Sequence, residues 1–163
     1  MQLKILVMAA VLASAVPFTV HGQILTERNI SLPLALNIAN AAMAACKGDG
    51  YDVSAAVVDR AGDLKVLLRA DTANPHNADL ARRKAYTART FKVPSMDVAK
   101  RTNGPTDLSG QRFIVDIIPL GGGVPINVGN DTIGALGISG SPTQEADEKC
   151  ANAAIASVAA QLR

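Results

Sequence analysis

Residues 74–88, NPHNADLARRKAYTA, are predicted to form a helix with two different faces. Small residues recur along one face at 100° per residue, where they would allow close packing on a sheet: Ala78, Ala81, Ala85 and Ala88. A mixed row lies roughly opposite, with Arg83 at its border: His76, Leu80, Lys84, Thr87 and Phe91. Because a solvated face would not be expected to hold Leu80 and Phe91, this row is predicted to meet a ligand or another subunit.

His76 is the member of this row best suited to bind a metal. The chain has two histidines, and the other, His21, lies in a segment that we expect to be removed. The positive end of a helix dipole disfavours imidazolium, so a histidine in the first turn tends to stay neutral and able to coordinate iron. The alternative is an ordinary polar surface or capping residue. A closed zinc site is not predicted, because it needs several soft ligands.

Cationic side chains gather in the same region: Arg82, Arg83, Lys84, Arg89 and Lys92. They could hold the carboxylates of an acidic metabolite or of a propionate-bearing cofactor. The alternative is a solvated face on which Asp79 and Arg83 form a helical ion pair. Lys84 differs from the others because it shares the row of His76.

Two further patterns have structural explanations. Glu145 and Glu148 lie one helical turn apart and could chelate ferric iron, although negative charge near a helix N-terminus explains them equally well. The glycines at 121–123, 134, 137 and 140 match neither phosphate-binding spacing, so they are predicted to permit sheet bends and close helix approach. No nucleophile elbow is present, and the sequence identifies no catalytic residue.

The first 22 residues are predicted to be an export signal. Lys4 precedes an apolar run from Ile5 to Val16, and small residues precede a cleavage site after Gly22. That run is shorter than the roughly 20 residues needed to span a bilayer. Residues 23–163 are therefore expected to form a single domain without a transmembrane segment, in the periplasm or outside the cell.

Composition excludes one class of partner and describes the core. The net charge of +2 is too small for a nucleic-acid-binding surface. Hydrophobic residues make up 48% of the chain but aromatic residues only 3%, so the core is expected to consist of Ala, Val, Ile and Leu.

Two cysteines, Cys46 and Cys150, remain in the mature chain. An oxidising compartment permits them to form a disulfide, and the alternative is two buried free thiols. No Cys-x-x-Cys-His motif occurs, which excludes c-type attachment of haem.

The periodicities predict the order helix, β-hairpin, helix, strand, β-hairpin, helix. The ranges are a helix at 31–48, strands at 52–59 and 64–68, helices at 74–91 and 94–100, strands at 113–118, 124–128 and 132–139, and a final helix from 141. Tight turns make antiparallel pairs, which indicates an antiparallel sheet. Both hairpins are apolar on both faces, so helices are expected to cover both sides.

Three residues are predicted to be N-caps of these helices. Ser31 precedes the first helix, with Pro33 in its first turn, and Asn74 precedes Pro75 at the start of the second. Ser141, with Pro142 and Gln144 after it, is predicted to begin the last helix in a capping box.

Four blocks in this order resemble the GlcG/HbpS-like proteins, also called the haem-degrading domain family: VSAAVVDRAGDLKVLLRAD, PHNADLARRKAYTA, GGGVPI and IGALGISGSPTQEADEKCANAAI. The resemblance begins near Ser31. It implies a profilin-like α+β fold, with a five-stranded antiparallel sheet and helices on both faces, and assembly into dimers or larger homo-oligomers. It also implies non-covalent binding of haem b, with His76 as the axial ligand and Lys84 in the site.

Three functions follow as hypotheses. The first is an exported haem- or tetrapyrrole-binding protein, iron-associated or haem-degrading, with Arg83 or Lys84 near the propionates. The second is a binding protein or enzyme for a small organic acid such as a 2-hydroxy acid, with Arg83 and Lys84 holding the carboxylate and His76 as general base. The third is an assembly module without a ligand, which would bury His76 and Leu80 at a subunit contact with no adjoining cavity.

Overall fold

The computed structural model describes residues 22–163; the predicted export signal lies almost entirely outside them. Four strands, β1 (Ser54–Asp59), β2 (Leu64–Arg69), β3 (Gly123–Val128) and β4 (Asp131–Ser139), form one antiparallel sheet in the order β2-β1-β4-β3. The central strand β1 pairs on both sides, so that Val57 lies opposite Val66 of β2 and Leu136 of β4. The two hairpins predicted from the sequence are confirmed, including the turn at Gly129, which has a positive φ of 58°.

The prediction of a fifth strand at residues 113–118 is wrong. A short 3₁₀ helix, η1 (Ser109–Phe113), ends at Phe113, which is 83% exposed, and in the irregular segment after it Val115 is 82% exposed. Asp116 has a left-handed φ of 66°, which is incompatible with an extended strand. Apolar composition alone does not make a strand when no neighbouring strand supplies hydrogen bonds.

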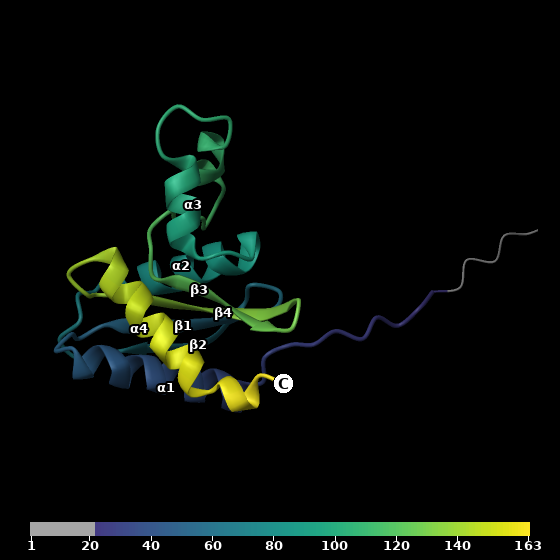
Figure 1. Cartoon of the computed structure of the whole chain (residues 1–163), viewed down its shortest axis with the longest axis horizontal. Helices are drawn as coiled ribbons and strands as arrows, with labels where there is room; N and C mark the ends of the chain where they lie inside the picture. Colours follow the sequence, from purple (N-terminus) through teal and green to yellow (C-terminus); the bar gives the residue numbers. More distant parts are fainter. Residues whose placement is uncertain (1–21) are drawn as a thin grey trace, which may run out of the picture.

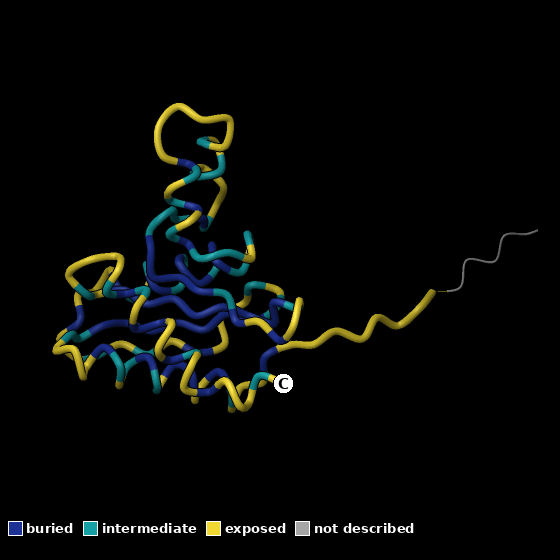
Figure 2. The backbone as a smooth tube through the Cα atoms, in the orientation of Figure 1, coloured by how far each residue is buried: buried dark blue, intermediate teal, exposed yellow. Residues whose placement is uncertain are grey.

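Helices cover both faces of the sheet, as expected (Figure 1). Helices α1 (Leu32–Gly48) and α4 (Gln144–Ser157) lie side by side on one face, and α2 (Asn77–Phe91) lies on the other. The larger core cluster lies between the sheet and the α1/α4 layer. Covering both faces explains why β1 is buried at every position (Figure 2). The expectation that both strands of each hairpin are covered on both faces is wrong for β2, because this edge strand is mostly exposed.

Small side chains let α2 lie close to the sheet. Ala81, Ala85 and Ala88 are fully buried, as the alanine face predicted, and Ala78 is half-buried. Opposite them, a Cβ atom added to Gly137 of β4 would collide with the backbone of Ala81. The interpretation of the glycines as positions of close helix approach is therefore confirmed at Gly137.

Cys46 of α1 and Cys150 of α4 form a disulfide, with their Cα atoms 5.4 Å apart although 104 positions separate them in the sequence. Both cysteines are buried. The bond joins the first and last long helices of the described chain.

The helix starts agree only in part with the predicted caps. Ser31 caps α1 and its Oγ accepts a hydrogen bond from the Leu34 amide at 3.4 Å. Asn74 is not a cap, because a turn at residues 75–76 intervenes and α2 begins after His76. Thr143, and not Ser141, caps α4, and its Oγ1 accepts from the Ala146 amide at 3.2 Å.

An arm projects from the α2 face, formed by α3 (Ser95–Thr102), the loop after it and η1 (Figure 1). Its far end is exposed (Figure 2). A last 3₁₀ turn, η2 (Ala159–Gln161), follows α4. Among the described residues, no helix is long and apolar enough to cross a bilayer.

Candidate functional site

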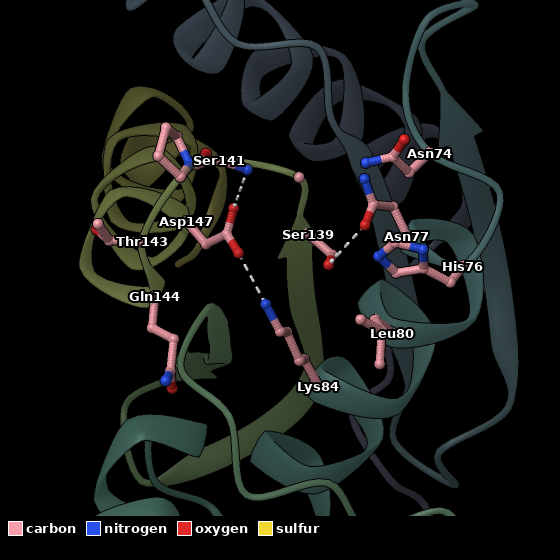
Figure 3. A pocket seen from close by; sticks show the side chains of 12 residues that line it. Asn74, His76, Asn77, Leu80, Lys84, Ser139, Ser141, Thr143, Gln144 and Asp147 are labelled. Carbon is pink, nitrogen blue, oxygen red and sulfur yellow. Dashed lines mark hydrogen bonds and ion pairs between the residues drawn. The ribbon is translucent and has the colours of Figure 1, made fainter.

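A pocket of about 260 Å³ lies where α2 and α4 begin and β4 ends, and we call it the α2–α4 pocket (Figure 3). Its side chains come from segments far apart in the sequence. They are Asn74, His76, Asn77, Leu80, Lys84, Ser139, Ser141, Pro142, Thr143, Gln144 and Asp147, with Gly140 between β4 and α4. Two helix N-termini therefore meet at one recess, and both place partial positive charge there.

His76 lies at the rim of this pocket and is exposed. Its backbone oxygen accepts from the Leu80 amide at 3.1 Å and so starts the helix. Its imidazole makes no hydrogen bond with any residue of the described chain. The ring is therefore available to a ligand. A pocket adjoins it, whereas the hypothesis of an assembly module expected no adjoining cavity.

Lys84 and Asp147 form a buried ion pair at the floor of the pocket (Figure 3). The Lys84 Nζ lies 2.7 Å from Asp147 Oδ2 and also donates to the Ile138 carbonyl at 3.0 Å. Asp147 Oδ1 accepts from the Ser141 amide at 2.9 Å. Each residue is only 3% exposed. The pair joins α2, the end of β4 and the first turn of α4, so Lys84 is not a free cation waiting for an anionic ligand.

Ser139 and Asn77 line the wall between the two helix starts (Figure 3). The Ser139 hydroxyl lies 3.5 Å from Asn77 Oδ1, which is a long and weak hydrogen bond. Both side chains are buried. They give the pocket a polar lining that a ligand with hydrogen-bonding groups would match.

The structure divides the predicted row of α2. His76, Leu80 and Lys84 line the pocket, but Thr87 is buried elsewhere and accepts from the Ile118 amide at 2.9 Å. Arg83 turns away from the pocket, and its Nη2 donates to the Ile117 carbonyl at 3.1 Å. Phe91 is half-buried at the end of α2, where the Arg101 guanidinium lies 4.6 Å from its ring centre.

The other cations of the predicted basic set also lie outside the pocket. Arg82 pairs with Asp116 at 2.8 Å and with Asp79 at 3.0 Å. The hydrogen bond with Asp116 raises the pKa of Arg82 and lowers that of the carboxyl group. Burial lowers the pKa of Arg89, and Lys92 is exposed at the end of α2. The set does not form one anion-binding surface.

Glu145 and Glu148 line a different recess, together with Met96, Lys100 and Lys149. Burial, followed by the nearby charge of Asp97, raises the pKa of Glu148. Among residues 22–163, no group of three or more His, Cys, Asp or Glu side chains is arranged to hold a metal ion. The two glutamates are therefore not part of a larger ligand set there.

Several residues of the pocket were not singled out as site residues from the sequence. Asp147 is one of them, and Gln144, which was predicted to be part of a capping box, is another. Gln144 Oε1 instead accepts from the Gly121 amide at 2.6 Å. A sequence signal for Asp147 existed: Gly140 follows the strand directly, and polar residues after it open a helix, a place where ligands often bind.

Comparisons with known proteins agree with this fold. Residues 30–156 match a family model described as haem-degrading protein HbpS-like. A double mutant of HbpS from Streptomyces reticuli has 34% sequence identity and a TM-score of 0.80, covering 89% of this chain and 98% of that one. The PduOC:heme complex has 27% identity and a TM-score of 0.73, covering 78% and 94%. A 15.0 kDa protein of the dhaT-dhaS intergenic region of Citrobacter freundii is 30% identical over 128 residues, which are 77% of this chain and 89% of that protein.

Proposed function

This chain belongs to the HbpS-like family of haem-degrading proteins, and from that premise we propose that it binds haem through His76 at the rim of the α2–α4 pocket. The observation that carries the proposal is the position of this imidazole. It is exposed, it borders a cavity, and no described residue engages it. It is also the only histidine after residue 21.

The donor chemistry at the rim fits a haem group. Imidazole is a common ligand of haem iron in proteins. Leu80 beside it offers apolar contact to a macrocycle. Attachment would be non-covalent, as for haem b, since the sequence contains no Cys-x-x-Cys-His motif. Bound iron would supply redox chemistry and bind oxygen species.

The proposal does not use Lys84 or Arg83 to hold propionates. The Lys84 ammonium is already paired with Asp147, and Arg83 faces the segment 112–120. His76 alone is therefore the residue on which haem binding depends.

Homo-oligomerisation is part of the same proposal. At about 260 Å³, the pocket is smaller than the roughly 300–1,000 Å³ of sites that enclose a drug-sized molecule. One chain would therefore enclose only an edge of a porphyrin, and a second copy would cover the rest.

Hemin titration tests haem binding. We expect a shift of the Soret band that saturates near one hemin per subunit and disappears in His76→Ala. Asn130→Ala, at the exposed turn between β3 and β4, is the control and should titrate like the unaltered protein. Identical spectra for His76→Ala and the unaltered protein would contradict the proposal. Degradation is then measured as loss of the Soret band after addition of a reductant or peroxide.

The same pocket supports a second candidate, binding of a small organic acid. The specific observation is its small volume together with its polar lining, which includes Asn77, Ser139 and Thr143. Two helix N-termini would favour a carboxylate, and His76 is the candidate general base. A thermal-shift screen of 2-hydroxy acids against hemin separates the candidates, because the ligand that binds more tightly at equal concentration raises the melting temperature more.

Export to the periplasm or the exterior completes the proposal. It is supported by the signal-like sequence of the first 22 residues and by the disulfide, which persists in oxidising compartments. The mass of protein purified after expression with its own leader tests it. A mature chain beginning at Gln23 is the expected result.

A further inference from the structure

Another recess borders α2, against the segment that was expected to be a strand. It has a volume of about 430 Å³, within the range of small-molecule sites. Its lining consists of Arg83 of α2, Arg112 and Phe113 of η1, and residues 117–120. We call residues 114–120, which contact α2, the strap, and we call this recess the strap groove.

Hydrogen bonds and an ion pair hold the strap in this irregular path. Asp116 pairs with Arg82, the Ile118 amide donates to Thr87 Oγ1, and the Leu120 carbonyl accepts from Ser95 Oγ at 2.6 Å. These contacts offset the left-handed backbone at Asp116, and they satisfy polar groups that a sheet would otherwise pair. The groove is therefore built on anchored backbone.

The floor and rim of the groove are apolar. Ile117 is buried, and Ile118, Pro119 and Leu120 are half-buried around it. Phe113 stands at the rim and is 83% exposed. Exposed apolar side chains next to a concave apolar surface are typical of a ligand or partner site.

The charge of the groove has one sign. Arg83 and Arg112 line it and no carboxylate does. The Nε atoms of both guanidinium groups are buried without a hydrogen-bond partner. Within residues 22–163, Arg112 forms no ion pair and donates no side-chain hydrogen bond. Arg83 keeps its bond to Ile117 and also forms the predicted helical pair with Asp79, its Nη1 lying 4.0 Å from Asp79 Oδ2. A guanidinium is a planar fork that matches a carboxylate, so the free cation here is suited to that group.

We propose that the strap groove binds an amphipathic carboxylate, with the carboxylate at Arg112 and Arg83 and the apolar body against Phe113 and residues 117–120. This site is separate from the one at His76 and does not depend on haem binding. It assigns a role to Arg83 different from that of a propionate ligand in the α2–α4 pocket.

Calorimetric titration of the full chain with decanoate, below its micellar concentration, tests the proposal. Saturable binding near one per subunit is expected. Arg112→Gln should weaken it about tenfold to a hundredfold, the range that hydrogen bonds to a charged group provide. Because Arg112 forms no ion pair and donates no side-chain hydrogen bond in the described chain, this variant should fold, and circular dichroism checks that. Arg69→Gln, an exposed arginine of the edge strand β2, is the matched control and should bind like the unaltered protein.

Two further ligands separate the contribution of the carboxylate charge from that of the ligand's alkyl chain. Acetate, which has the carboxylate without the body, and decanol, which has the body without the charge, should both bind far more weakly than decanoate. Phe113→Ser should weaken decanoate binding as well. Equal binding of decanol and decanoate, or no saturable decanoate binding, would overturn the proposal.

Hemin distinguishes this site from the other one. Arg112→Gln should leave the hemin titration unchanged, and His76→Ala should leave decanoate binding unchanged. Loss of both ligands in Arg112→Gln would overturn the separation of the two sites, whereas loss of hemin binding in His76→Ala alone agrees with both proposals. A protein that binds decanoate but not hemin would overturn only the haem proposal.

Discussion

At the scale of single residues, the buried ion pair of Lys84 and Asp147 determines what the α2–α4 pocket can do. The Lys84 ammonium, which lies on the same helix face as His76, bonds to Asp147 of α4 and to the carbonyl of Ile138 in β4. It therefore joins α2, β4 and α4. The ligand is then left with the imidazole and the neutral polar groups of the walls. The sequence correctly predicted that Lys84 lies at the site, but it did not predict that Asp147 is its partner.

Removing one member of this pair should destabilise the protein strongly. We expect Lys84→Met to lower the free energy of unfolding by about 3–5 kcal/mol, because Asp147 is left charged in a buried site. Urea unfolding followed by circular dichroism measures it. The double variant Lys84→Met/Asp147→Leu should recover most of the loss.

The matched control for Lys84 is Lys149→Met, because Lys149 pairs with Asp49 at the surface and its side chain is 70% exposed. Little change is expected there, since solvent screens such pairs. Equal losses in Lys84→Met and Lys149→Met would show that the buried pair has no special role.

Glu148 provides a pH-dependent prediction at the same scale. Burial raises the pKa of its carboxyl group, so the folded state holds the proton more tightly than the unfolded state. Its ionisation therefore opposes folding as pH rises above the ordinary glutamate pKa, and has no effect below it. Glu148→Gln should raise the melting temperature at pH 7 and change it little at pH 4. A gain of the same size at both pH values would contradict this assignment.

At the scale of elements, the disulfide between α1 and α4 is the main covalent restraint on the fold. Asp147 lies one turn before Cys150 on α4, so the bond also holds one wall of the α2–α4 pocket. On the other face of the sheet, close packing of α2 against Gly137 restrains the opposite wall of this pocket.

Removing the disulfide should destabilise the whole domain. Closing a loop of about 100 residues is worth about 4.7 kcal/mol in the chain-entropy model, and losses of about 2–5 kcal/mol are typical. Cys46→Ala/Cys150→Ala should therefore show a lower guanidinium midpoint. Dithiothreitol should lower the midpoint of the unaltered protein and leave that of the variant unchanged. Insensitivity of the unaltered protein to full reduction would contradict the prediction.

At the scale of the whole molecule, the α2–α4 pocket and the strap groove both border α2 and differ in chemistry. The α2–α4 pocket is polar, with one imidazole, and the strap groove is apolar, with two guanidinium groups. The projecting arm brings further apolar side chains, such as Phe113 and Leu108, to the exposed surface. Such a surface is typical of proteins that bind partners or assemble.

Assembly is therefore a testable property of the whole molecule. We expect sedimentation velocity to show a dimer or larger species, and hemin to stabilise it, because one chain encloses only part of a porphyrin. His76→Ala should assemble normally but lose the effect of hemin. A monomer in the presence of saturating hemin would contradict the proposed covering by a second copy.

The sequence by itself determined the features that depend on local geometry. Helical periodicity correctly predicted that Ala81, Ala85 and Ala88 pack against the sheet. Ser31 indicated the start of the first helix, and apolar runs separated by turn residues predicted both hairpins. The four resembling blocks also identified the family. Each signal is carried by residues a few positions apart, whose spacing sets which face they share.

Tertiary structure alone decided the features that depend on distant partners. Residues 113–118 have strand-like composition, but no strand pairs with them, and the Ile117 carbonyl and Ile118 amide bond to side chains of α2 instead. Helical spacing predicted that Lys84 would face a ligand, but its ammonium pairs with Asp147, which lies 63 positions later in the sequence. Arg83 and Lys84 are adjacent in sequence but face different recesses. Burial and pairing depend on which segments the chain brings together, and spacing along the sequence does not record that.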